Sequence, residues 1–151
     1  MSFHSANGTR GARQPKAGRL SRWFNAFMMN RIRRTGGRAM GFDALVLTTV
    51  GAKSGQPRTN PVGYFTDGDG WLIVASAAGA PKNPAWYYNI AAHPDRVRIE
   101  LRGQHLDVVA TQLHGEARAR AWAKITTEAP QFAKYEEKTD REIPVIRLAR
   151  R

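Results

Sequence analysis

Two cations flank one glycine-bracketed turn in residues 48–61, which read TTVGAKSGQPRTNP. Lys53 lies inside the turn, Arg58 follows it, and Asn60 with Pro61 opens the return of the chain. Apolar residues on either side indicate two strands joined by this turn. The segment is therefore predicted to be a hairpin that holds two positive charges close together.

A phosphate-binding P-loop is the obvious alternative, because the same segment contains a Lys-Ser pair between glycines. The P-loop pattern places a glycine directly before the lysine and starts a helix at once. Here Ala52 precedes Lys53, and Gly55 and Pro57 would break a helix that began at Ser54. The P-loop interpretation is excluded.

A second informative segment, residues 75–89, reads ASAAGAPKNPAWYYN. A strand that ends in small residues leads to a glycine loop and then to a helix, for which Asn83 is a suitable N-cap and Pro84 the first helical residue. Such a loop presents backbone N–H groups to an anionic or carbonyl-bearing ligand. Tight turns also use small residues, so the loop alone is weak evidence for a binding site. Together with the two cations of the hairpin it indicates one.

Several kinds of chemistry are disfavoured by the residues that are missing. There are no cysteines, which removes thiol nucleophiles and thiolate metal sites. The four histidines lack the spacing of metal ligands, and no G-x-S-x-G elbow is present. We expect no metal site, and any redox chemistry must come from a cofactor.

The composition is that of one compact domain with a basic N-terminal arm. The chain has 151 residues, of which 42% are hydrophobic, and a net charge of +12. Arg and Lys residues gather before the first carboxylate, Asp43, and residues 1–18 have almost nothing to bury. We predict a disordered arm over residues 1–18 and a cytoplasmic protein, since neither a membrane span nor a signal peptide is evident.

A basic amphipathic helix is predicted over residues 19–35. Its apolar residues recur at helical spacing, and Gly36 and Gly37 stop it. The pattern fits two roles equally: packing on the domain's own core, or docking on an anionic membrane surface as a peripheral protein. The charge of the arm also suits nucleic acid, which remains a third, less favoured role.

The rest of the chain, residues 40–151, is predicted to be an α+β domain. Six short, mainly antiparallel strands suggest a small barrel, and turns at residues 67–70 and 102–104 mark two hairpins. Helices are expected over residues 83–92 and 116–127, with a short helical turn at residues 132–137. The six strands are residues 44–49, 60–65, 71–76, 96–101, 106–111 and 143–148.

Three separated motifs resemble the deazaflavin-dependent nitroreductase family, whose members bind coenzyme F420. They are LTTVGAKSGQPRTNPVGYF, SAAGAPKNPAWYYNIAAHP and TDREIPVIRL, in this order, and the resemblance covers residues 42–148. It implies a split β-barrel fold, which agrees with the strand pattern. It also implies an oxidoreductase with F420 as cofactor.

The resemblance assigns coenzyme-binding roles to particular positions. The phosphate and acidic tail would be held at the hairpin and the deazaflavin ring by the small-residue loop, with support from the following helix. The lysine that the family often has after the loop serine is replaced by Ala77. The implied coenzyme-binding residues are Lys53, Ser54, Arg58, Asn60, Pro61, Ala75, Ser76, Ala77, Ala78, Gly79, Trp86 and Asn89.

On the acceptor side, Tyr135 matches one of the phenols of the family's nitroimidazole-reducing members and is the candidate catalytic residue. Phe132 and Lys138 stand where others would be. We expect reduced F420 to be the hydride donor for a flat, electron-poor acceptor: a quinone, an enone or a nitro compound. An FMN-binding relative on the same barrel and a non-catalytic coenzyme carrier remain alternatives, and the sequence leaves the oligomeric state open.

Overall fold

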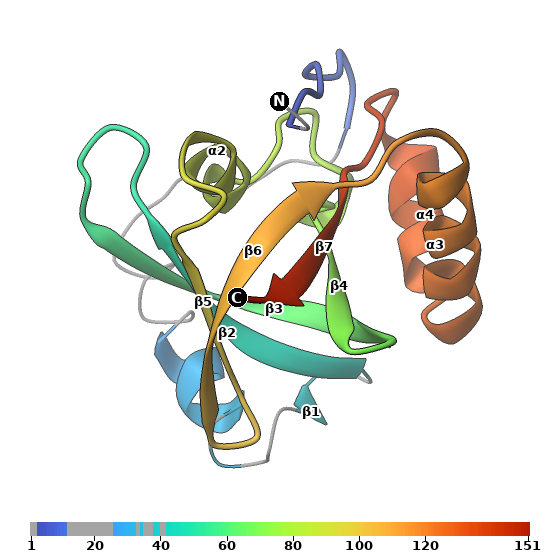
Figure 1. The fold of residues 1–151 in the computed structure, drawn as a ribbon. Coiled ribbons are helices and arrows are strands. Elements are labelled where there is room, and N and C mark those ends of the chain that lie inside the picture. Colours follow the sequence, from blue (N-terminus) through green and yellow to red (C-terminus); the bar gives the residue numbers. More distant parts are fainter. Residues whose placement is uncertain (1–2, 12–25, 33, 35–37, 40–41) are drawn as a thin grey trace.

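Antiparallel strands close into a barrel in the computed structural model, which describes residues 3–11, 26–32, 34, 38–39 and 42–151 (Figure 1). The sheet order is β1-β2-β3-β4-β7-β6-β5, and β5 also pairs with β2, so that six strands form a closed ring. This confirms the predicted α+β split barrel. The strands are β1 (Arg38–Ala39), β2 (Phe42–Val50), β3 (Pro57–Asp67), β4 (Gly70–Val74), β5 (Val97–Leu101), β6 (Gln104–Gln112) and β7 (Val145–Arg150).

The helices fall close to their predicted places. A short 3-10 helix, η1 (Ala77–Gly79), precedes α2 (Ala85–Ala92), and α3 (Gly115–Glu128) leads into α4 (Gln131–Lys138). The predicted N-cap at Asn83 is wrong. Pro84 is the N-cap of α2 without a side-chain cap bond, because the Asn83 side-chain oxygen accepts a hydrogen bond from Arg141 instead.

Apolar side chains from all six ring strands fill the barrel interior, with contributions from α2. Because successive side chains of a strand point to opposite faces, Trp71 and Ile73 of β4 point into this core while Leu72 and Val74 point outward. All five residues of β4 are nevertheless buried. The outer face of β4 must therefore be covered by another element.

Helices α3 and α4 provide that cover and form a second core on the outside of the barrel (Figure 1). Ile125 of α3 and Phe132 of α4 pack against Phe65, Leu72 and Val145 of three strands. The rings of Phe65 and Phe132 meet edge to face at 5.8 Å. The short helix α4 is thereby fixed against the barrel, directly beside η1.

The helical residues 26–32 pack on the barrel at β2. Ile32 is buried with Ala44 and Val46, and Met28 and Met29 pack against them. Phe27 points elsewhere and is 50% exposed. The described part of the predicted 19–35 helix is therefore helical and uses part of its apolar stripe for internal packing; residues 19–25, 33 and 35 lie outside the described residues. No helix among the described residues is long and apolar enough to cross a membrane.

Residues 3–11 lie against the barrel, which departs from the disorder predicted for residues 1–18. Hydrogen bonds to polar partners hold this segment, although its composition includes few apolar residues that could be buried. One of these partners is Asp140, and its hydrogen bonds from Thr9 lower its pKa to about 2. Residues 1–2 and 12–18 lie outside the described residues. The contacts pair Ser5 with Gln112, Asn7 with Tyr88, Gly8 with Pro81, and Thr9 with Asp140.

Truncating Ile73 tests the packing of the barrel interior. Its side chain is fully buried, so Ile73→Ala should lower the free energy of unfolding by about 2–5 kcal/mol in urea denaturation. Asp107→Asn is the control: it removes an ion pair with Arg98 whose side chains are 60% and 58% exposed, and should cost less than about 1 kcal/mol. Equal losses in the two variants would contradict a close-packed barrel core.

Candidate functional site

The β2–β3 hairpin presents its two cations to solvent. The strands pair up to Val50 and Pro57, and the loop between them closes with a hydrogen bond from the Gly51 N–H to the Gln56 carbonyl at 2.8 Å. Gly55 takes a φ of +70°, which a glycine adopts without strain. Lys53 and Arg58 are both exposed. Nothing in the described hairpin neutralises them, so both can meet an anionic ligand.

Ser54 and Asn89 set the shape of this hairpin. The Ser54 hydroxyl accepts a hydrogen bond from the Gln56 N–H at 3.2 Å and lies 3.5 Å from Nη2 of Arg58. Asn89, buried in α2, accepts a hydrogen bond from the Ala52 N–H and donates one to the Thr49 hydroxyl. Helix α2 therefore holds the hairpin loop, and both polar atoms of Asn89 are engaged within the protein.

A cavity of about 230 Å³ lies between β3, β4 and α4. Most of its lining residues are apolar or aromatic, although the surface that they present to the cavity is about equally polar and apolar. Five predicted residues line it. The lining residues are Pro61, Val62, Gly63, Val74, Ser76, Ala77, Pro84, Trp86, Phe132 and Tyr135.

The wall formed by residues 75–80, the ring loop, bends sharply. Ala77 has a φ of +46° and Gly79 a φ of +84°, both in the left-handed region. Glycine is required at position 79 for a second reason: a Cβ there would lie 2.9 Å from the Tyr135 carbonyl oxygen and 3.0 Å from the Lys138 Cβ. Helix α4 therefore packs directly on the ring loop, which places Tyr135 beside Ser76 and Ala77.

Tyr135 and Phe132 form the α4 side of the cavity. Their rings are perpendicular at 5.5 Å, and the Lys138 ammonium lies 5.9 Å from the centroid of the Tyr135 ring. Phe132 is buried, whereas Tyr135 is only partly buried. The Tyr135 phenol is thus the titratable group that α4 contributes to the cavity lining.

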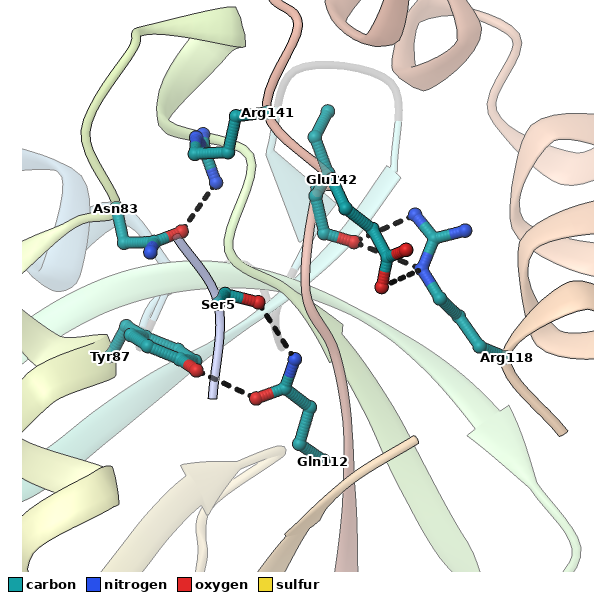
Figure 2. A network of polar contacts seen from close by, with 8 residues as sticks. Ser5, Asn83, Tyr87, Gln112, Arg118, Arg141 and Glu142 are labelled. Carbon is teal, nitrogen blue, oxygen red and sulfur yellow. Dashed lines mark hydrogen bonds and ion pairs between the residues drawn. The ribbon is translucent and has the colours of Figure 1, made fainter. Parts of the chain in front are cut away.

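Arg141 supports the ring loop without lining the cavity. It is 3% exposed, and burial lowers the pKa of its guanidinium. It donates hydrogen bonds to the carbonyls of Ala75, Ser76 and Ala80 at 3.0, 2.8 and 3.1 Å. A fourth bond goes to the side-chain oxygen of Asn83 (Figure 2). Sequence reasoning missed Arg141, although it lies within the third family motif, because nothing in TDREIPVIRL marks it as buried.

The remaining predicted residues fall into two groups. Lys53, Ser54 and Arg58 gather at the hairpin, with Asn60 on β3 between the hairpin and the cavity, while Ala75, Ala78 and Gly79 complete the ring loop. Asn89 joins α2 to the hairpin and is not part of the cavity wall. No cluster of metal ligands is found among the described residues.

The arrangement suits an elongated ligand with a flat aromatic part and an anionic part. Arg58 and Pro61 are three residues apart on β3, about 10 Å along the strand, so the hairpin and the cavity follow each other along β3, with these two side chains on opposite faces of the strand. Charge-assisted hydrogen bonds from the hairpin fit a phosphate or carboxylate. The cavity, with its aromatic lining residues, fits a ring system. These two features match the coenzyme that the sequence motifs imply.

The chain is similar to a known family of proteins. A family model described as F420H(2)-dependent quinone reductase matches residues 20–149. A protein of Mycobacterium tuberculosis (strain ATCC 25618 / H37Rv), "F420H(2)-dependent quinone reductase Rv1261c", is 42% identical over 111 residues, which are 72% of this chain and 74% of that protein.

Two solved structures resemble the whole barrel. One, described as "Structure of F420-H2 Dependent Reductase (FDR-A)", is 38% identical with a TM-score of 0.64 and covers 70% of this chain and 92% of its own. Another, described as a domain-swapped dimer, is 33% identical with a TM-score of 0.66 and covers 85% and 98%. The extent of the family match over the barrel and its preceding helix confirms the expected relationship: this chain belongs to the F420H(2)-dependent quinone reductase family.

Proposed function

We propose that this chain is an oxidoreductase that uses reduced coenzyme F420 to reduce a quinone. The observation that carries this proposal is the cationic hairpin that adjoins an aromatic-lined cavity on the same strand, β3. Family membership supports F420 as the cofactor. FMN, the alternative flavin, also carries a phosphate but lacks the acidic tail for which a second cation is useful.

Different residues of the chain are proposed to bind the anionic part and the ring system of the coenzyme. Lys53 and Arg58 hold the phosphate and carboxylate groups, and Arg58 has the fork geometry for a bidentate contact. Ser54 steadies Arg58 from the neighbouring position in the loop. Ser76 and Ala77 of the ring loop, together with Trp86, enclose the ring system and exclude water from it. Ala77 replaces a lysine often found in the family, so the hairpin carries the anion binding.

Tyr135 is the proposed catalytic residue. When bound, the reduced deazaflavin supplies a hydride to the acceptor. A quinone that accepts a hydride develops negative charge on an oxygen, and a phenol within reach stabilises that charge by a hydrogen bond or donates its proton. Tyr135 lines the cavity and has a hydroxyl, whereas its neighbour Phe132 has none. The alternative role of Tyr135 is packing over the rings.

The helical residues 26–32 and 34 are proposed to hold the enzyme at an anionic membrane surface, where quinones dissolve. The supporting observation is the 50% exposure of Phe27 next to the exposed Arg31 and Arg34. An apolar side chain beside cations is the pattern of an interfacial helix. Among the described residues of this helix, Met28, Met29 and Ile32 pack on β2, and Phe27, Arg31 and Arg34 form the edge that can meet lipid.

The hairpin assignment is tested by Lys53→Ala and Arg58→Ala. Each should weaken coenzyme F420 binding by about 1.5–3 kcal/mol through loss of a charge-assisted hydrogen bond, without lowering the free energy of unfolding. Binding is measured by fluorescence titration. Arg120→Ala, an exposed cation on α3, is the control and should bind like the parent protein. Parent-like binding by both hairpin variants would show that the anion site is elsewhere.

The role of Tyr135 is tested by removing only its hydroxyl. Tyr135→Phe should bind coenzyme normally and lose about tenfold to a thousandfold in quinone turnover, as expected for one transition-state hydrogen bond or acid. Turnover is followed by the oxidation of the reduced coenzyme. If turnover is unchanged in Tyr135→Phe and falls only in Tyr135→Ala, the tyrosine packs over the rings and does no acid chemistry.

Membrane docking is tested by cosedimentation with vesicles of phosphatidylglycerol or phosphatidylcholine. Phe27→Ser should reduce binding to the anionic vesicles by about fivefold to tenfold, the effect of burying half a phenylalanine side chain. Tyr88→Ser, at the other large exposed apolar side chain, is the control and should bind like the parent. Absence of vesicle binding by the parent protein would refute the docking proposal.

A further inference from the structure

We propose that Arg141 is the positioning residue of the ring loop, and that it sets the affinity for the coenzyme without touching the cavity. This inference rests on the proposed coenzyme site. Its basis is that one buried guanidinium binds three carbonyls of residues 75–80, while Ser76 and Ala77 of the same loop line the cavity. Arg141 itself does not line it.

Peptide geometry links the two sides of the loop. In a trans peptide the carbonyl of one residue and the N–H of the next point in opposite directions, and no cis peptide bond is present in the described chain. Arg141 draws the carbonyls of Ala75 and Ser76 toward itself. The N–H groups of Ser76 and Ala77 consequently point away from Arg141, and both residues line the cavity whereas Arg141 does not.

The same bonds hold a bent backbone in place. Ala77 has a positive φ, and a non-glycine residue adopts that conformation only when its surroundings enforce it. The Ser76 carbonyl accepts from both the Gly79 N–H and Arg141, and the Ala80 carbonyl is bound as well. Arg141 therefore fastens both ends of the bend, at residues 75–76 and at residue 80.

Arg141 also places a positive charge behind the ring loop. Among the described residues no Asp or Glu forms an ion pair with it: of the two acids adjacent in sequence, Asp140 binds Thr9 and Glu142 pairs with Arg118. A guanidinium that binds carbonyls polarises the attached peptides and strengthens their N–H groups as donors. The loop is thus prepared for carbonyl or anionic oxygens of a ring system, as in other backbone anion sites.

A second arginine provides a matched control. Arg118 of α3 also donates to a backbone carbonyl, that of Ile143, at 2.8 and 3.3 Å, and pairs with Glu142 at 3.5 Å. In Figure 2 the Arg141 side chain extends from its segment toward Asn83, whereas Arg118 reaches the next residue, Glu142, from the other side. Arg118 makes no hydrogen bond to the ring loop in the described structure. Its loss should affect stability alone.

The experiment compares Arg141→Gln and Arg141→Lys with Arg118→Gln. For each protein, the unfolding transition is measured in urea. The dissociation constant for oxidised coenzyme F420 is then measured without denaturant, under conditions in which the variant is folded. We expect Arg141→Gln to raise the dissociation constant at least tenfold. Arg141→Lys, which keeps the charge and some donors, should recover part of that loss, while Arg118→Gln should bind coenzyme like the parent protein.

Two results would overturn the proposal: parent-like affinity in folded Arg141→Gln, or an equal loss of affinity in Arg118→Gln. If Arg141→Gln does not fold, the proposal is tested on the parent protein by NMR. Titration with coenzyme should then shift the backbone amide NMR signals of Ser76 and Ala77, and unmoved signals would contradict the assigned direction of these N–H groups. Failure of the parent to bind F420 would instead refute the coenzyme site itself.

Discussion

Closure of the sheet through β2 is the constraint on which the rest of the structure depends. β2 pairs with β3 from Ala44 to Val50 and, through residues 46–48, also with β5. Closure removes the free edges of the ring strands and creates an interior that apolar side chains fill. It also fixes β3, which carries the cationic hairpin at one end and the cavity-lining residues Pro61 to Gly63 further along. The distance between the proposed anion site at the hairpin and the cavity is therefore set by the barrel.

The arginines of this chain show two uses of one side chain. Arg58 is exposed at a turn, where a free cation adds little to stability and remains available to a ligand. Arg141 is buried and donates its hydrogen bonds to the carbonyls of the ring loop. A buried polar group left without a partner would lower the free energy of unfolding. In our proposal, ligand binding and positioning of the ring loop are tasks of different residues, the exposed Arg58 and the buried Arg141.

Local sequence patterns predicted most of the fold because they report local physics. Alternating apolar residues and the turns at Gly68 and Gly103 were enough for the strands and hairpins. Polar contacts between residues far apart in the sequence could not be predicted from these local patterns. Asn83 has the chemistry of an N-cap, yet Arg141, 58 residues away, uses its oxygen. Residues 3–11 have the composition of a disordered arm, yet hydrogen bonds to distant partners such as Asp140 hold them on the barrel. Neither contact can be recognised from the sequence immediately around the residues that form it.

The candidate site was predictable in part for the same reason. The hairpin cations and the small-residue loop are visible in sequence, and the family motifs connected them. What sequence could not supply is that α4 closes the cavity with Tyr135 by packing on Gly79. Binding of F420 at this site is tested by calorimetric titration of the parent protein with F420 and with FMN under identical conditions. We expect tighter binding of F420, with part of the difference lost at high salt because two exposed cations contribute. Equal or tighter binding of FMN would contradict this expectation.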